Sequence, residues 1–190
     1  MAILRNQDGS LESFAKNPDL VSLKFCVERN VARRHRAYFD SDNNPTIGIG
    51  FNLRRDDARD KIEGLGIDYD QVCNQQVELT DEQIDDLLIT DLAKAIDDAN
   101  ALFANFDDLI PARQIVLVDM AFNLGKNRLS GFGKMIAAVA AEDWDEAANQ
   151  MINSAWYRQV KSRGERNVEV MRSGELVTDY LPVGISAAIV

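Results

Sequence analysis

The fold is decided by the stretch from Arg36 to Leu53, which reads RAYFDSDNNPTIGIGFNL. Its centre, Asn-Asn-Pro at 43–45, is strong turn chemistry, because Asn tolerates a positive φ and Pro fixes its own φ. The flanking residues 37–39 and 46–49 predict two short strands of a hairpin. The second strand alternates Gly with Ile, so one of its faces carries no side chain and a ligand could approach it closely.

Asp40 closes the first predicted strand and Thr46 opens the second, so the two side chains are expected to lie near each other across the turn. Two interpretations follow. In one, Asp40 only caps its own turn, as Asp often does. In the other, the pair belongs to a reactive site.

Composition indicates a globular chain with a sizeable core, because 190 residues are 46% hydrophobic and 27% charged. No run of about 18 apolar residues and no N-terminal apolar segment are found, so we expect no membrane insertion and a start in the cytosol. The net charge of −10 disfavours nonspecific binding to nucleic acid or anionic lipid. Acidic residues concentrate at 56–108 and basic residues at 29–36 and 158–172, which could steer an anionic polymer to one place.

The sequence predicts no metal site. Cys26 and Cys73 match no ligand spacing and are expected to be reduced thiols packed as small hydrophobes. The single histidine, His35, lies in a basic run and is expected to be solvated rather than catalytic.

Apolar spacing and end signals place the remaining elements. A capping box at Thr80–Gln83 opens a helix of about 20 residues, and Pro111 opens a largely apolar, buried helix to Leu124. Further helices are expected at 20–30, 58–65, 134–141, 145–154 and 162–172, with one or two helical turns at 11–16. The expected fold is therefore α+β and predominantly helical. We expect one domain over 1–190, divided into an N-terminal extension (1–20), a sheet lobe (20–80), a connecting helix (80–100), a helical lobe (101–180) and a tail (181–190).

An ordered set of motifs resembles one known family. Arg34, Tyr38, Asp40 and the TIGIG run at 46–50 resemble the catalytic hairpin of the T-even-type phage lysozymes, which are glycoside hydrolases. The resemblance covers about 20–180, and further fragments occur in the family's order: TDEQ at 80, AFNLG at 121, SGF at 130, WDEAA at 144, SAWY at 154 and the pair Arg163 and Arg166. It implies a lysozyme-like fold with a small hairpin lobe joined by a long helix to an all-helical lobe.

The resemblance also implies an activity, cleavage of the bond between N-acetylmuramic acid and N-acetylglucosamine in bacterial peptidoglycan, with no cofactor or metal. Matched by position, Asp40 takes the family's catalytic Asp and Thr46 its catalytic Thr. Arg163 matches the Arg that pairs with the catalytic Glu.

The family's catalytic Glu has no direct match. The family places it nine residues before the Asp, where this chain has Val31. Glu28 is the nearest candidate for the proton donor. An offset of three residues on a helix turns a side chain by about 60° and moves it about 4.5 Å. Glu28 therefore requires residues 29–31 to form a local insertion after the helix.

Three further positions belong to the resemblance. Phe51 stands where the family often has His, so a His-mediated bridge is not expected. Asn123 could bind sugar or cap its helix, and Phe132 could line the substrate site or belong to the core.

The resemblance thus implies an endolysin-type muramidase, a monomer made in the host cytoplasm and released to the wall by a holin-type route, or else carried in the virion. The alternative is a glycan-binding or virion structural protein on a lysozyme scaffold without catalysis, motivated by Val31 and the acidic net charge. A third interpretation, an unrelated α+β protein whose hairpin only packs, is disfavoured by the ordered motifs.

Overall fold

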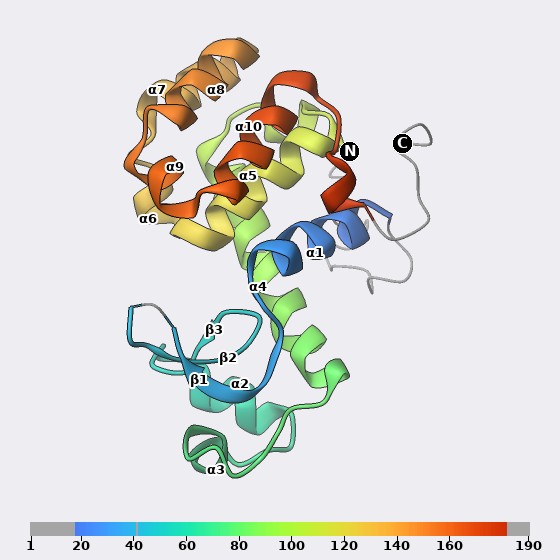
Figure 1. Ribbon diagram of the computed structural model, residues 1–190, viewed down its shortest axis with the longest axis vertical. Coiled ribbons are helices and arrows are strands. Elements are labelled where there is room, and N and C mark those ends of the chain that lie inside the picture. Colours follow the sequence, from blue (N-terminus) through green and yellow to red (C-terminus); the bar gives the residue numbers. More distant parts are fainter. Residues whose placement is uncertain (1–17, 41, 182–190) are drawn as a thin grey trace. The chain divides into compact units, whose positions relative to one another are not determined.

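The computed structural model describes residues 18–40 and 42–181, and its contacts divide the chain into two compact units (Figure 1). The sheet unit comprises residues 31–91. The helical unit combines residues 1–30 with 92–190, of which 18–30 and 92–181 are described. The helical turns expected at 11–16 and nearly all of the expected tail, 182–190, lie outside the described residues. The division into a single domain with lobes stays a prediction.

The sheet unit is built on three antiparallel strands in the order β1 (Arg34–Phe39), β2 (Pro45–Gly48) and β3 (Phe51–Asn52). The predicted hairpin is confirmed. In its register, Thr46 lies opposite Tyr38 on one side and Asn52 on the other. Strand β3 was not expected, because a strand of two residues is too short to show an alternating pattern.

Helices α2 (Ala58–Gly64), α3 (Tyr69–Cys73) and the first half of α4 (Asp81–Leu102) complete the sheet unit. The capping box at the start of α4 is confirmed. The Thr80 amide donates to Gln83 Oε1 (2.9 Å), and the Gln83 amide donates to Thr80 Oγ1 (3.3 Å). The buried core of this unit is aliphatic and aromatic: Ile47, Phe51, Leu53, Ile62, Val72, Leu79 and Ile84.

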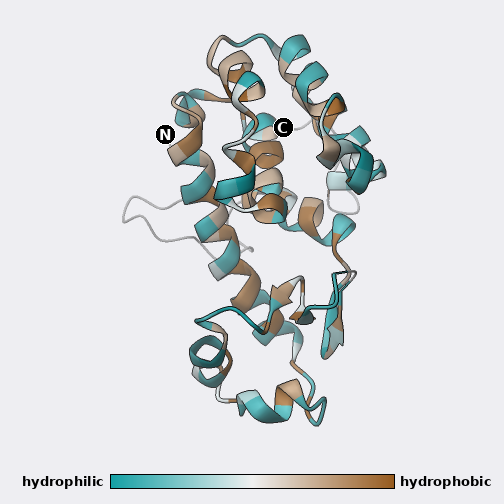
Figure 2. Cartoon of the chain, turned by 90° about the vertical axis from the view of Figure 1, so that its left-hand side faces the viewer, coloured by the Kyte–Doolittle hydropathy of each residue, from teal (hydrophilic) through white to brown (hydrophobic). Residues whose placement is uncertain are grey.

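The helical unit is organised around α5 (Pro111–Leu124), which is largely buried as predicted, although Phe122 and Leu124 near its end are only partly buried. Pro111 occupies the first turn, where its missing N–H is not needed. Helices α1 (Pro18–Asn30) and α10 (Ser162–Ser173) pack on α5. The other elements are α6 (Lys126–Leu129), α7 (Gly133–Ala140), α8 (Trp144–Ile152), α9 (Ala155–Val160), η2 (Phe106–Asp108) and η3 (Thr178–Tyr180). Hydrophilic and hydrophobic residues alternate along the helices, as Figure 2 shows.

The two cysteines differ in their surroundings. Both are free thiols, as expected, but only Cys26 is buried. The prediction that Cys73 packs as a small hydrophobe is wrong. Cys73 is the last residue of the short helix α3 and is exposed, whereas the neighbouring Val72 is buried. Within the described part of the chain, no helix is both long and apolar enough to cross a membrane.

Candidate functional site

The carboxylate of Asp40 is held by the turn that follows it. Its Oδ1 accepts hydrogen bonds from the backbone amides of Asp42 (2.9 Å) and Asn44 (2.7 Å), and its Oδ2 accepts one from Asn44 Nδ2 (3.2 Å). These bonds, the one from the Asn44 amide above all, lower the pKa of Asp40, and the nearby Arg54 guanidinium adds to the effect. Asp40 is therefore an ionised carboxylate of fixed orientation at neutral pH.

Thr46 is fixed by the same turn. Its side chain is buried, with 2% of the residue exposed, and its Oγ1 donates a hydrogen bond to the carbonyl oxygen of Asn44 (3.0 Å). Asn44 thus contacts both Asp40 and Thr46 and sets their mutual position. The sequence analysis treated Asn44 only as a turn residue, although an Asn directly before Pro, between two candidate site residues, was the available signal.

Glu28 lies inside helix α1, two residues before its end, and is partly buried. The helix continues through Arg29 and Asn30, and Val31 is the first residue beyond it. The local insertion that the assignment of Glu28 requires is therefore not formed by Arg29 and Asn30. The side chain of Asn30 explains why the helix continues: its Nδ2 donates to the carbonyl oxygen of Cys26 (2.7 Å) and closes the last turn. The catalytic role of Glu28 stays a prediction.

Arg163 is engaged by a carboxylate that the sequence analysis did not single out. Its guanidinium donates to Asp119 through Nε to Oδ2 (2.9 Å) and through Nη2 to Oδ1 (2.7 Å) and to the backbone oxygen (3.1 Å). Both side chains are buried, with 7% of Arg163 and none of Asp119 exposed. Burial alone lowers the pKa of Arg163, but the charge and hydrogen bonds of Asp119 reverse this and raise it. The signal for Asp119 was a single acidic residue in the apolar run of α5.

This ion pair continues into a buried polar network. Asn167 Nδ2 donates to Asp119 Oδ2 (2.8 Å), and the Tyr180 hydroxyl donates to Asn167 Oδ1 (2.7 Å). Burial is the largest cause that raises the pKa of Tyr180, so this phenol stays protonated. The thiol of Cys26 lies beside the network, and burial raises its pKa too. The network satisfies the hydrogen bonds of the buried Asp119 carboxylate.

The remaining predicted residues have defined surroundings. Asn123 is exposed near the end of α5, and its Oδ1 accepts a hydrogen bond from the Trp156 indole (2.8 Å). This contact orients its amide, while the helix itself ends at Gly125. Phe132 is partly buried and directly precedes α7. Sugar binding by Asn123 and Phe132 stays a prediction.

Phe51, for which no His-mediated bridge was expected, lies beneath an arginine that also forms ion pairs. The Arg55 guanidinium lies over the Phe51 ring, 4.7 Å from its centroid. Its Nη1 donates to Asp91 on α4 (2.7 Å), and its Nη2 donates to Asp57 (2.9 Å). Stacking and pairing together attach the loop after β3 to α4 within the sheet unit. His35 is exposed, as expected, with Nδ1 2.7 Å from the Leu79 carbonyl oxygen.

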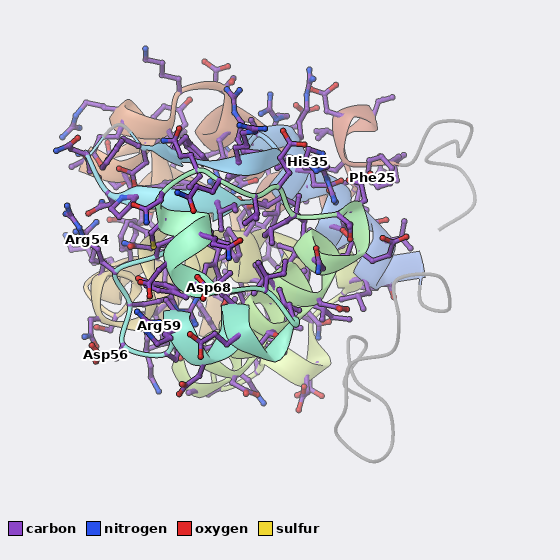
Figure 3. All side chains as sticks on the ribbon, turned by 90° about the horizontal axis from the view of Figure 1, so that it is seen from below. Phe25, His35, Arg54, Asp56, Arg59 and Asp68 are labelled. Atoms are coloured by element: carbon purple, nitrogen blue, oxygen red, sulfur yellow. The ribbon has the colours of Figure 1, made fainter. Side chains whose placement is uncertain are left out.

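The surface next to the hairpin is charged, and Arg54 and Asp56 extend outward in Figure 3. Over residues 18–40 and 42–181, no group of three or more His, Cys, Asp or Glu side chains is placed to hold a metal ion.

A small antiparallel sheet with an ionised hairpin carboxylate, in a chain that is otherwise mainly helical, defines a lysozyme-like α+β protein. Comparison with known sequences agrees. The profile of the phage lysozyme family matches residues 30–172, and the chain belongs to this family.

Three relatives illustrate the range of the family. The chain is 26% identical to probable T4-type lysozyme 2 and 25% identical to probable T4-type lysozyme 1 of Dictyostelium discoideum, in each case over 82% of this chain and 96% of the relative. It is 28% identical to the pre-baseplate central spike protein Gp5 of Enterobacteria phage T4 over 84% of this chain. The match spans only 29% of that spike protein's length.

Proposed function

We propose that the protein hydrolyses the bond between N-acetylmuramic acid and N-acetylglucosamine in bacterial peptidoglycan, as an endolysin-type muramidase. The hairpin is the observation that carries the proposal. In the hairpin, the ionised carboxylate of Asp40 and the hydroxyl of Thr46 are both hydrogen-bonded to Asn44. Membership of the phage lysozyme family supplies the substrate class.

The proposed chemistry needs two oxygen groups on opposite faces of the sugar, because glycoside hydrolysis passes through an oxocarbenium-like transition state. Asp40 takes the role of the charged carboxylate. With Thr46 it positions and activates the attacking water. Glu28 is the proposed proton donor to the leaving oxygen, and Arg163 the residue that orients the acid side of the site. Inversion of configuration is what the family resemblance implies.

The proposed biological setting is lysis of a bacterial host. The protein would accumulate in the host cytoplasm, act as a monomer and reach the wall through holin-type release. Delivery as part of a virion is the other setting, and the likeness to a pre-baseplate central spike protein, Gp5, motivates it.

A second candidate function, glycan binding or a structural role without cleavage, is favoured by two observations on the acid side. Helix α1 runs unbroken to Asn30, so that Val31 occupies the position where the family has its acid. Arg163, expected to pair with that acid, is bound by Asp119 instead. This arrangement is expected of a lysozyme scaffold that lost its catalytic acid and in which another buried carboxylate neutralises the arginine.

Release of reducing ends from purified peptidoglycan tests the first function. If Glu28 is the acid, Glu28→Gln should lower the rate by about 10²–10⁴-fold, as is typical for loss of a general acid. Asp40→Asn should abolish release, and both variants should keep cooperative melting. Glu63→Gln, an exposed change in α2, is the matched control and should leave the rate unchanged. A Glu28→Gln variant with full activity would remove Glu28 from the mechanism.

Val31→Glu separates the two functions. If the natural chain binds peptidoglycan in a pull-down without releasing reducing ends, and Val31→Glu gains release, the protein is a scaffold that lost its acid. If the natural chain cleaves and Val31→Glu adds nothing, the enzyme hypothesis stands. A natural chain that neither binds nor cleaves peptidoglycan contradicts both.

A further inference from the structure

The helical unit carries an open groove that the proposed function does not use. Its volume is about 550 Å³, and its walls come from α8, α9 and α10, which pack against one another (Figure 1). The lining residues are Ile152, Tyr157, Glu165, Val168, Glu169, Arg172 and Ser173. The volume lies in the range of about 300–1,000 Å³ that is usual for ligand sites in proteins.

The apolar part of the groove is closely packed. The Tyr157 ring packs against Gly164 so closely that a Cβ at this position would lie 2.7 Å from Tyr157 Cδ2. The glycine therefore lets one edge of the ring approach the backbone of α10. Val168 is buried and Ile152 partly buried beside it. An aromatic ring and two aliphatic side chains thus form the apolar surface of the groove.

The polar part of the groove is acidic. Glu165 and Glu169 stand one turn apart on α10, where like charges repel. Within residues 18–40 and 42–181, no ion pair joins either of them to a cation. Arg172, the one basic residue among those that line the groove, is already engaged. Its Nη2 donates to Asn149 Oδ1 (2.7 Å), and its Nε lies 3.6 Å from Asp145. The groove therefore presents two carboxylates that form no ion pair within the described residues, next to a closely packed aromatic ring.

We propose that this groove binds an arginine side chain presented by a segment of a partner polypeptide. The guanidinium stacks on Tyr157 and donates to the carboxylates of Glu165 and Glu169, while its aliphatic stem covers Ile152 and Val168. The excess of acidic over basic side chains in the lining disfavours an anionic occupant, and the aromatic wall favours a planar cation. Arginine anchors of this kind, buried against aromatic residues, dominate many protein interfaces.

Arginine fits better than lysine for a geometric reason. A guanidinium has five N–H donors in a planar fork and can bind two carboxylates while it stacks, whereas an ammonium is a compact and strongly hydrated charge. The inference is independent of wall cleavage, because neither Asp40 nor Thr46 takes part.

Binding of short peptides to the full-length protein tests the proposal. Acetyl-Ala-Ala-Arg-Ala-Ala-amide is titrated while the backbone amide resonances of Gly164 and Val168 are followed by NMR. The same peptide with lysine or with citrulline, which has the shape of arginine without its charge, is the comparison. We expect saturable shifts at Gly164 and Val168, strongest with arginine, and binding at least about tenfold weaker with citrulline, since charge-assisted hydrogen bonds are lost.

A pair of charge-matched variants locates the site. Glu165→Gln/Glu169→Gln should weaken arginine-peptide binding by about tenfold or more. Asp107→Asn/Asp108→Asn removes the same net charge from two exposed residues of η2 and should leave binding within about twofold. Equal weakening in both variants would mean nonspecific attraction to an acidic protein and would overturn the proposal. Equal binding of the citrulline peptide would overturn it as well, even if a variant failed to fold.

Discussion

Replacing Asp119 by Asn should destabilise the protein strongly, although the change is nearly isosteric. The Asp119 carboxylate is fully buried and accepts two hydrogen bonds from the Arg163 guanidinium and one from Asn167. An amide places an N–H group where the carboxylate accepts from Arg163 or Asn167, and it leaves the arginine charge buried without a counter-charge. Removing one partner of a buried pair costs about 3–5 kcal/mol.

The size of the effect can be measured by thermal and urea unfolding. For a chain of this length, each kcal/mol lowers Tm by about 2–4 °C, so Asp119→Asn should melt about 6–20 °C lower. The double variant Asp119→Leu/Arg163→Met is the control, because replacing both charges by apolar groups is often neutral or stabilising. It should recover most of the loss. If Asp119→Asn unfolds within about 1 kcal/mol of the natural chain, or if the double variant is as unstable as the two single changes added together, the pair does not act as a buried ion pair.

Three further predictions concern other parts of the molecule. Arg55→Ala should lower the free energy of unfolding by about 2 kcal/mol or more, because the largely buried Asp91 loses its partner. Arg36→Ala removes an exposed pair with Glu78 and should lower the free energy of unfolding by only about 0–1 kcal/mol. Equal losses in urea unfolding of the two variants would contradict this. Asp40 should contribute a pH-dependent stability. Its folded pKa lies below the unfolded value of about 3.9, so the contribution is present above about pH 4 and is lost as the pH falls through the folded pKa. An NMR titration of the Asp40 carboxyl carbon should show the lowered pKa, and an ordinary value would refute the hydrogen-bond account. Gly164→Ala should lower the free energy of unfolding by about 1–3 kcal/mol, because the added methyl group displaces the Tyr157 ring. Gly133→Ala adds a methyl group in open space and should not lower it. Chemical denaturation of both variants tests this difference.

Local signals predicted most of the helices and the hairpin. The capping box at Thr80, the proline at position 111 and the Asn-Asn-Pro turn each act through neighbours in sequence, so that their physics is readable without a structure. Strand β3 and the short helices α3, α6 and α9 were missed, because elements of two to six residues show no complete period.

The candidate site was predictable only where it is local. The proximity of Asp40 and Thr46 follows from the turn between them. Asn44, which lies in that turn, could have been identified as the residue that contacts both. The pairing of Arg163 with Asp119 joins residues 44 positions apart and depends on how α5 and α10 pack. By contrast, the end of helix α1 at Asn30 agrees with the helix expected at 20–30. That boundary follows from the last turn of α1, which Asn30 closes on the Cys26 carbonyl.

The double attachment of Asn44 to Asp40 and Thr46 has an engineering consequence. Because one loop residue holds both side chains, Asp40, Asn44 and Thr46 form a hydrogen-bonded cassette within the hairpin of β1 and β2. Such a cassette could be transplanted into another three-stranded ribbon with the same register, and it would bring its oriented carboxylate along. Laboratory evolution that aims to change specificity should therefore randomise the surroundings of this loop and keep Asn44 constant.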